Sequence, residues 1–142
     1  MPDKAIIDET LRWRRFAYDD LASAVLLHSS SSVSPGQTCF HAQQAVEKAF
    51  KCLLVYLEMV VPKTHDLGFL QRSLPDGMQS HLISEIELDD LSFWAVQSRY
   101  PGEDIEASSH DAETALVTAR NVLKIIDSDL TANGLILPHS NA

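Results

Sequence analysis

Residues 39–54, with the sequence C-F-H-A-Q-Q-A-V-E-K-A-F-K-C-L-L, decide the fold of this chain. In and just after this stretch, apolar residues recur at intervals of three and four, which places them on one side of an α-helix. These residues are Cys39, Ala42, Val46, Ala49, Phe50, Leu53 and Leu57. We expect the helix to span about residues 37–60, because Pro62 lacks a backbone donor and stops it. The pattern predicts an amphipathic helix with its apolar side in a core.

Helical periodicity continues on both sides of this segment. A helix is expected over about residues 5–29, where the apolar residues are Trp13, Phe16, Ala17, Ala24 and Leu27. A short helix should begin at Thr64 or Asp66 and end near Leu74, since either polar side chain can accept from free backbone donors. Residues 78–99 fit one bent helix or two short ones, with a possible break near Glu87, and they carry apolar residues at Leu82, Ile86, Leu88, Leu91, Trp94 and Ala95.

The last predicted helix spans about residues 109–130, with Ser108 as its N-cap and Asp111 as the acidic partner three residues on. No strand-like alternation of useful length occurs. The chain is therefore expected to be all-α, an up-down helical bundle of four to five helices. Residues 1–130 form one domain in this interpretation, and residues 131–142 form a loose tail with an apolar patch at 135–137.

Composition narrows the possible functions. At 142 residues, with 45% apolar and 22% charged residues, the chain is long enough for one core. Its net charge of −9 disfavours non-specific binding to nucleic acids and to anionic membranes. The basic group Arg12, Arg14 and Arg15 is flanked by acids and is interpreted as a solvated helix face. The N-terminus lacks the basic-then-apolar order of a secretion signal, so a cytoplasmic location is expected.

The two cysteines and six histidines do not suggest a metal centre. Cys39 and Cys52 lie thirteen positions apart in one predicted helix, so roughly 20 Å separates them and they cannot form a disulfide. They are expected to be small core residues. The histidines lack the spacing of a metal site, and neither a metal nor another cofactor is expected.

Five segments of the chain, taken in order, resemble the HEPN family. They are W-x3-A-x2-D-L-x2-A from Trp13, C-F-H-A-Q-Q-A-V-E-K-A from Cys39, T-H-D-L at 64–67, R-Y-P at 99–101 and D-A-x2-A-L from Asp111. The resemblance implies a bundle of four or five helices that is usually a homodimer. It also implies a minimal nucleotidyltransferase as a frequent partner, in a toxin–antitoxin-like pair.

Some HEPN proteins are metal-independent ribonucleases, in which an Arg and a His four to six residues apart approach RNA in the dimer groove. This chain departs from that pattern, because Arg99 is followed by Tyr100 and Pro101 and the next histidine, His110, comes after ten intervening residues. The resemblance therefore favours an R-Y-P type without the ribonuclease motif. A ribonuclease that uses Arg99 and His110 remains the alternative, and a dimeric scaffold without a ligand is a third.

The candidate ligand-binding residues are Arg99, Tyr100, Asp20, His41 and Lys48. Asp20 falls among apolar positions, so its carboxylate should form an interhelical brace or, alternatively, a polar pocket with Arg99 or Tyr100. Arg99 could hold a nucleotide phosphate or pair with an acid at a helix end. His41 and Lys48 share a helix face and either reach an anion together or are simply solvated.

Two further expectations concern residues outside this set. His65, in the T-H-D-L turn, is expected to be structural and to hydrogen-bond the local backbone. Trp13 and Trp94 should fill the core or a dimer seam. The sequence thus predicts a binding module whose groove lies near Arg99, Tyr100 and Asp20, and whose ligand is a nucleotide or a partner nucleotidyltransferase.

Overall fold

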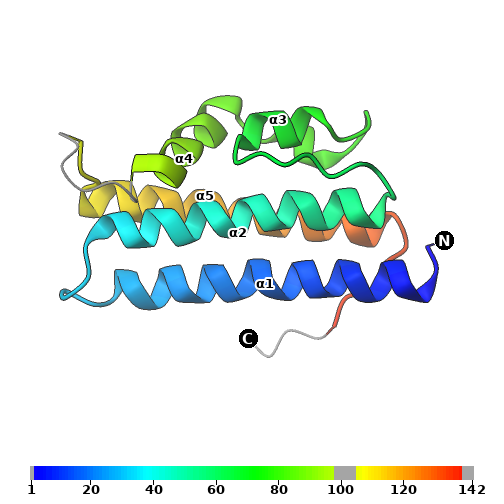
Figure 1. Cartoon of the computed structure of the whole chain (residues 1–142), viewed down its shortest axis with the longest axis horizontal. Helices are drawn as coiled ribbons and strands as arrows, with labels where there is room; N and C mark the ends of the chain where they lie inside the picture. Colours follow the sequence, from blue (N-terminus) through cyan, green and yellow to red (C-terminus); the bar gives the residue numbers. More distant parts are fainter. Residues whose placement is uncertain (1, 98–104, 139–142) are drawn as a thin grey trace.

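The computed structural model describes residues 2–97 and 105–138, and every regular element within them is helical. The elements are α1 (Lys4–His28), α2 (Pro35–Tyr56), α3 (Leu67–Arg72), the 3-10 helix η1 (Gln79–Leu82), α4 (Glu85–Gln97) and α5 (Ser109–Ala132). α1 and α2 run antiparallel, α5 runs behind α2 in the same direction as α2, and α3 and α4 lie on the side of α2 away from α1 (Figure 1). The all-α up-down bundle expected from the sequence is confirmed.

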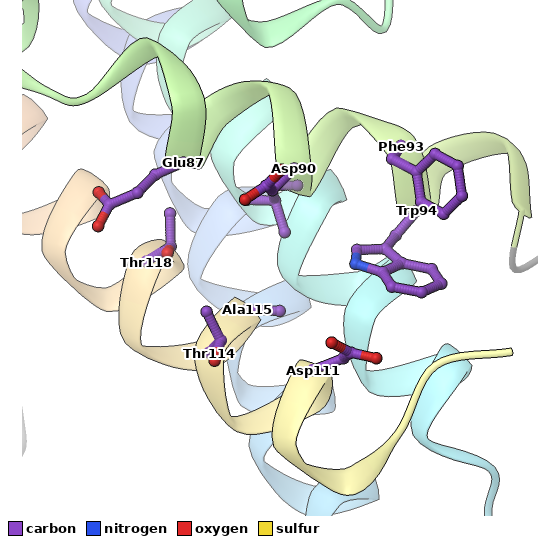
Figure 2. Close-up of a pocket in the computed structure, with 9 residues that line it drawn as sticks. Glu87, Asp90, Phe93, Trp94, Asp111, Thr114, Ala115 and Thr118 are labelled. Atoms are coloured by element: carbon purple, nitrogen blue, oxygen red, sulfur yellow. The ribbon is translucent and has the colours of Figure 1, made fainter. Parts of the chain in front are cut away.

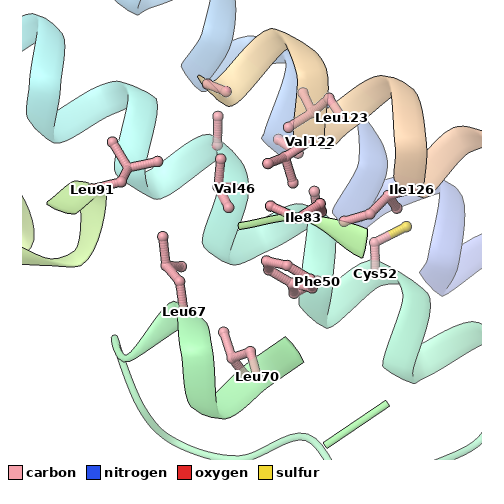
Figure 3. Packing of buried hydrophobic residues seen from close by; sticks show 14 of the residues in the cluster. Val46, Phe50, Cys52, Leu67, Leu70, Ile83, Leu91, Val122, Leu123 and Ile126 are labelled. Atoms are coloured by element: carbon pink, nitrogen blue, oxygen red, sulfur yellow. The ribbon is translucent and has the colours of Figure 1, made fainter. Parts of the chain in front are cut away.

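α2 is the central helix of the bundle, because it contacts α1, α3, α4 and α5. Its apolar side chains are buried as the periodicity predicted, and Phe50, Leu53 and Leu54 are wholly buried. They pack against Leu67 and Leu70 of α3 and against Val122, Leu123 and Ile126 of α5 in one continuous cluster (Figure 3). Each such large side chain contributes roughly 1.5–3 kcal/mol through burial.

Local hydrogen bonds at the helix starts follow the sequence closely. Asp66 caps α3 by accepting from the Phe69 N–H at 3.1 Å. Of the two candidates from the sequence, Thr64 and Asp66, the N-cap of this helix is therefore Asp66. Ser108 and Asp111 form a capping box at α5, in which Ser108 Oγ accepts from Asp111 N–H at 3.0 Å and Asp111 Oδ2 accepts from Ser108 N–H at 2.8 Å. These bonds satisfy backbone donors that have no partner inside the helix.

The end of α2 lies earlier than the sequence predicted. The helix ends at Tyr56, because Glu58 adopts a left-handed backbone conformation with φ of 57°. Met59 N–H then donates to Leu54 O at 3.0 Å and Glu58 N–H donates to Val55 O at 3.0 Å, which is the Schellman arrangement usually built on glycine. Pro62 follows after the helix has already ended, so the prediction of residue 60 as its end was wrong.

Three apolar residues assigned to buried faces are instead exposed: Phe16 is 43% exposed, Leu82 85% and Ile86 74%. Leu82 is the last residue of η1 and Ile86 is the second residue of α4, and neither shares the buried face formed by Leu88 and Leu91. The region 78–97 forms two short helices that are separated at 83–84, earlier than the break expected near Glu87. A change of helix direction here moves the two residues out of the core.

Arg14 contradicts the expectation that its basic cluster is solvated. Its guanidinium binds both carboxylate oxygens of Asp127 on α5, at 2.8 and 2.9 Å, and its side chain is only 16% exposed. Tyr18 donates to the same carboxylate, and burial together with this hydrogen bond raises the pKa of Tyr18. Arg14 therefore braces α1 against α5, whereas Arg12 remains exposed.

Residues 131–135, at the start of the predicted tail, pack against the bundle. α5 continues to Ala132, and Leu135 is buried with its N–H donated to Leu130 O at 3.0 Å. Tyr56 of α2 also donates its hydroxyl to Asn133 O at 2.8 Å. The apolar patch at 135–137 thus begins with a core residue. Among the helices of residues 2–97 and 105–138, none has the length and apolar character needed to cross a membrane.

Candidate functional site

One polar cluster joins the middle of α1 to α2. Asp20 Oδ1 lies 3.0 Å from His41 Nδ1, and Asp20 Oδ2 accepts a short hydrogen bond from Lys48 Nζ. The Asp20 side chain is only 14% exposed, so its charge requires these partners. Three of the residues chosen from the sequence therefore meet, and Asp20 forms the interhelical brace. His41 and Lys48 are paired rather than simply solvated.

A second polar cluster connects α2 to the turn before α3. Glu47 is buried, and its carboxylate lies 2.7 Å from His65 Nδ1, 3.1 Å from Lys51 Nζ and 3.2 Å from Gln43 Nε2. Gln43 Nε2 also donates to the His65 carbonyl at 3.3 Å. His65 is structural, as expected, but its ring binds a carboxylate instead of the local backbone.

The pKa of Glu47 reflects these contacts. Burial alone would raise it, but the hydrogen bonds from His65, Gln43 and Lys51 outweigh burial and lower it below its ordinary value. Glu47 is thus charged in the folded protein, and Lys51 is held beside it with a side chain only 13% exposed. The two clusters form what we call the α2 polar band: Asp20, His41, Lys48, Glu47, Lys51 and His65.

Glu47 was missed in the sequence as a site residue. A signal was present, because Glu47 and Lys51 are four residues apart on a helix, a spacing that allows an ion pair. Its contact with His65 could not be anticipated, because the path of the turn between α2 and α3 is not set by periodicity.

Arg99 and Tyr100 lie outside the described residues, so the pocket that either could form with Asp20 is not described. His110 lies in the first turn of α5 and is exposed. The pairing of Arg99 with His110 likewise falls outside the described residues.

The cysteines are buried in the core, as expected, and neither is in a disulfide. Burial raises the pKa of both thiols to about 12, which keeps them protonated and unreactive at neutral pH. Trp13 and Trp94 are partly buried against the core. Within residues 2–97 and 105–138, no three His, Cys, Asp or Glu side chains converge in a way that could hold a metal ion.

A groove of about 300 Å³ lies between α4 and α5, away from the α2 polar band. Leu91 and Ala115 contribute apolar surface to it, and Thr114 and Thr118 contribute hydroxyl groups. Its carboxylates are Glu87, Asp90 and Asp111. Figure 2 shows Glu87 opposite Thr118 at one end and Trp94 beside Asp111 at the other. No pattern in the sequence indicates this groove, because its two walls belong to different helices.

The fold and these sites define a small all-α bundle in which a central helix carries a band of paired polar side chains. A HEPN domain profile matches residues 10–129, and the chain belongs to the HEPN family. The resemblance found in the sequence is thereby confirmed. A comparison with curated proteins found no match.

Two solved structures share the fold. TT1696 from Thermus thermophilus is 23% identical, with a TM-score of 0.73, and the match covers 85% of this chain and 98% of that one. ST0689, described as an archaeal HEPN homologue, is 24% identical with a TM-score of 0.61, and the match covers 84% of this chain and 95% of that one. At these identities the similarity supports the fold alone.

Proposed function

We propose that this HEPN protein is a binding module without catalytic activity, which holds the phosphates of a nucleotide on the α2 polar band. We further propose that it acts as a homodimer and as the partner of a minimal nucleotidyltransferase in a toxin–antitoxin-like pair. The nucleotidyltransferase and the dimer rest on family membership. The nucleotide site rests on the arrangement of side chains along α2.

The observation that carries the nucleotide proposal is the placement of Lys48 and Lys51, two cations on one side of α2 in a chain of net charge −9. Asp20 and Glu47 fix the positions of these ammonium groups before any ligand arrives, which lowers the entropy cost of binding. Lysine is a common ligand of phosphate oxygens.

Calorimetric titration of the purified protein with ATP tests the nucleotide site. Replacing both lysines, Lys48→Met and Lys51→Met, should weaken binding about tenfold or more, because two charged contacts are lost. Lys124→Met is the matched control, since Lys124 is an exposed lysine of α5 and should leave affinity unchanged. No heat with millimolar ATP would contradict the nucleotide proposal and favour the dimeric scaffold. Equal loss in the control would contradict the placement of the nucleotide on the α2 polar band.

The non-catalytic part of the proposal needs a separate assay. Labelled RNA incubated with the protein should remain intact. Cleavage of the RNA that is abolished by Arg99→Ala and by His110→Ala would contradict the proposal and show that the protein is a ribonuclease.

The expected assembly is tested by size-exclusion chromatography with light scattering, which should give the mass of a dimer. A monomer at micromolar concentration would contradict the homodimer. Co-expression with the product of a neighbouring nucleotidyltransferase gene should give a complex that survives purification, and separate elution of the two proteins would contradict the partnership.

A further inference from the structure

α1 carries an exposed aromatic ring next to the α2 polar band. Phe16 is 43% exposed although it is a large apolar residue, and it lies four residues before Asp20 on α1. Residues four apart share one side of a helix, so Phe16 lies one turn from the carboxylate that binds Lys48. Phe16 does not belong to the buried core, so packing of the core does not explain its ring.

The antiparallel packing of α1 and α2 sets the level of this ring along the band (Figure 1). Near the start of α1, the Thr10 carbonyl accepts from Cys52 Sγ at 3.2 Å, and further along α1 Asp20 accepts from Lys48 Nζ. Phe16 lies between these two contacts on α1. It is therefore level with the part of α2 that carries both lysines of the band.

The residue before Phe16 adds a planar cation to the ring. The Arg15 guanidinium lies over the Phe16 ring, 5.4 Å from its centroid. Arg12 and Arg14, the other two arginines of this cluster, each lie beside a carboxylate. Arg15 is exposed and forms no ion pair within residues 2–97 and 105–138.

These groups match the two chemical parts of a nucleotide. A phenyl ring and a guanidinium plane both stack on the flat face of a nucleobase. Lysine ammonium groups bind phosphate oxygens. An inorganic polyphosphate would use the lysines only, whereas a nucleotide would use the lysines and the stacked pair together.

We propose that the Arg15–Phe16 pair stacks on the base of the nucleotide whose phosphates Lys48 and Lys51 bind. This inference rests on the nucleotide site proposed above and adds recognition of the base to it. The ligand class is then a nucleoside triphosphate rather than an inorganic polyphosphate. Stacking needs a flat ring and no particular set of hydrogen-bonding groups, so ATP and GTP should bind with affinities within about threefold of each other.

Calorimetric titration of the full-length protein with ATP and with inorganic tripolyphosphate separates base recognition from phosphate binding. Tripolyphosphate has the same chain of phosphates and at least as much negative charge, but it has no base. We expect ATP to bind at least about fivefold more tightly, because only ATP stacks on the Arg15–Phe16 pair.

Variants of the pair should affect the binding of ATP alone. Phe16→Leu keeps an apolar side chain but removes the ring, and it should weaken ATP binding about fivefold while tripolyphosphate binding stays within about twofold. Phe93→Leu is the matched control, since Phe93 is 39% exposed on α4, on the side of α2 away from α1 (Figure 1), and it should change neither affinity. Arg15→Lys keeps the charge but loses the planar surface, and it should weaken ATP binding about threefold.

Trp13 gives an independent optical measurement. It lies three residues before Phe16, so the two side chains are neighbours on α1. Trp94→Phe leaves Trp13 as the only tryptophan of the chain. In this background, the Trp13 emission should change when ATP is added and stay constant with tripolyphosphate.

The possible failures are distinguishable. No binding of ATP would overturn the nucleotide site and this inference with it. ATP binding that is lost in Lys48→Met with Lys51→Met, but is no tighter than tripolyphosphate binding, would overturn the inference and leave the phosphate site in place. An ATP affinity that Phe16→Leu does not change, or that Phe93→Leu lowers equally, would also overturn the inference alone.

Discussion

The α2 polar band and the α4–α5 groove both carry carboxylates, but these differ in their partners. Asp20 and Glu47 are largely buried and each contacts two or more basic or imidazole groups, whereas Glu87, Asp90 and Asp111 have no cationic neighbour in the described residues. Asp20 and Glu47 therefore link neighbouring elements of the fold. Within residues 2–97 and 105–138, the groove carboxylates form no ion pair.

The largest expected effect of a single substitution is at Glu47. Glu47→Ala leaves Lys51 with a largely buried charge and no acidic partner, so we expect a loss of about 3 kcal/mol in the free energy of unfolding. Urea denaturation at pH 7 measures it. Glu113→Ala, at an exposed position of α5, should change stability by at most about 0.5 kcal/mol. Equal values for both variants would mean that the band does not brace the fold.

Asp20→Asn should have the next largest effect. The amide keeps the shape of the carboxylate but removes the ionic contacts with Lys48 and His41, and we expect a loss of about 1–2 kcal/mol. Thermal melting of the variant and the parent protein measures it. An unchanged melting temperature would show that Asp20 lies at the α1–α2 contact without stabilising it.

Glu47 also predicts a pH dependence. Its pKa is lower in the folded protein than its ordinary value of 4.5, so the unfolded chain takes up a proton first as the pH falls. Its stabilising contribution is complete well above pH 4.5 and is lost as the pH falls through the folded-state pKa. The difference in unfolding free energy between the parent and Glu47→Gln should therefore be largest near pH 7 and shrink as the pH falls below about 4.5. A difference independent of pH down to about 3 would contradict this assignment.

The smallest expected effect belongs to the groove. Asp90→Asn removes a charge that lies three residues from Glu87 on α4, and relief of this repulsion should stabilise the protein by at most about 0.5 kcal/mol. Thermal melting at low salt measures the change, and high salt should reduce it. A clear loss of stability would show that Asp90 has a structural partner.

The helical architecture was predictable from the sequence because periodicity alone places residues such as Val46 and Leu123 in one core. The caps at Asp66 and Ser108 were also predictable, because a polar side chain just before a helix can accept from its free backbone donors. The end of α2 was not predictable from the sequence. A left-handed backbone conformation is expected of glycine, and here Glu58 adopts it. The exposure of Leu82 and Ile86 depends on the change of direction between η1 and α4, which no local pattern specifies.

The candidate site was predictable only in part. Asp20, His41 and Lys48 could each be selected from their positions on a helix, and the need of Asp20 for a partner was evident. Their contact depends on how α1 lies against α2, which joins residues more than twenty positions apart. The groove depends on the packing of α4 against α5 and therefore could not be read from either helix alone.

The most direct test compares two double variants that remove the same charge from the two regions, by urea denaturation at pH 7. Asp20→Asn with Glu47→Gln should lower the free energy of unfolding by at least about 2 kcal/mol, because both braces of the α2 polar band are lost. Glu87→Gln with Asp90→Asn should leave it within about 0.5 kcal/mol of the parent protein. Equal losses in the two variants, or a larger loss from the groove pair, would contradict the division between the structural carboxylates of the band and those of the groove.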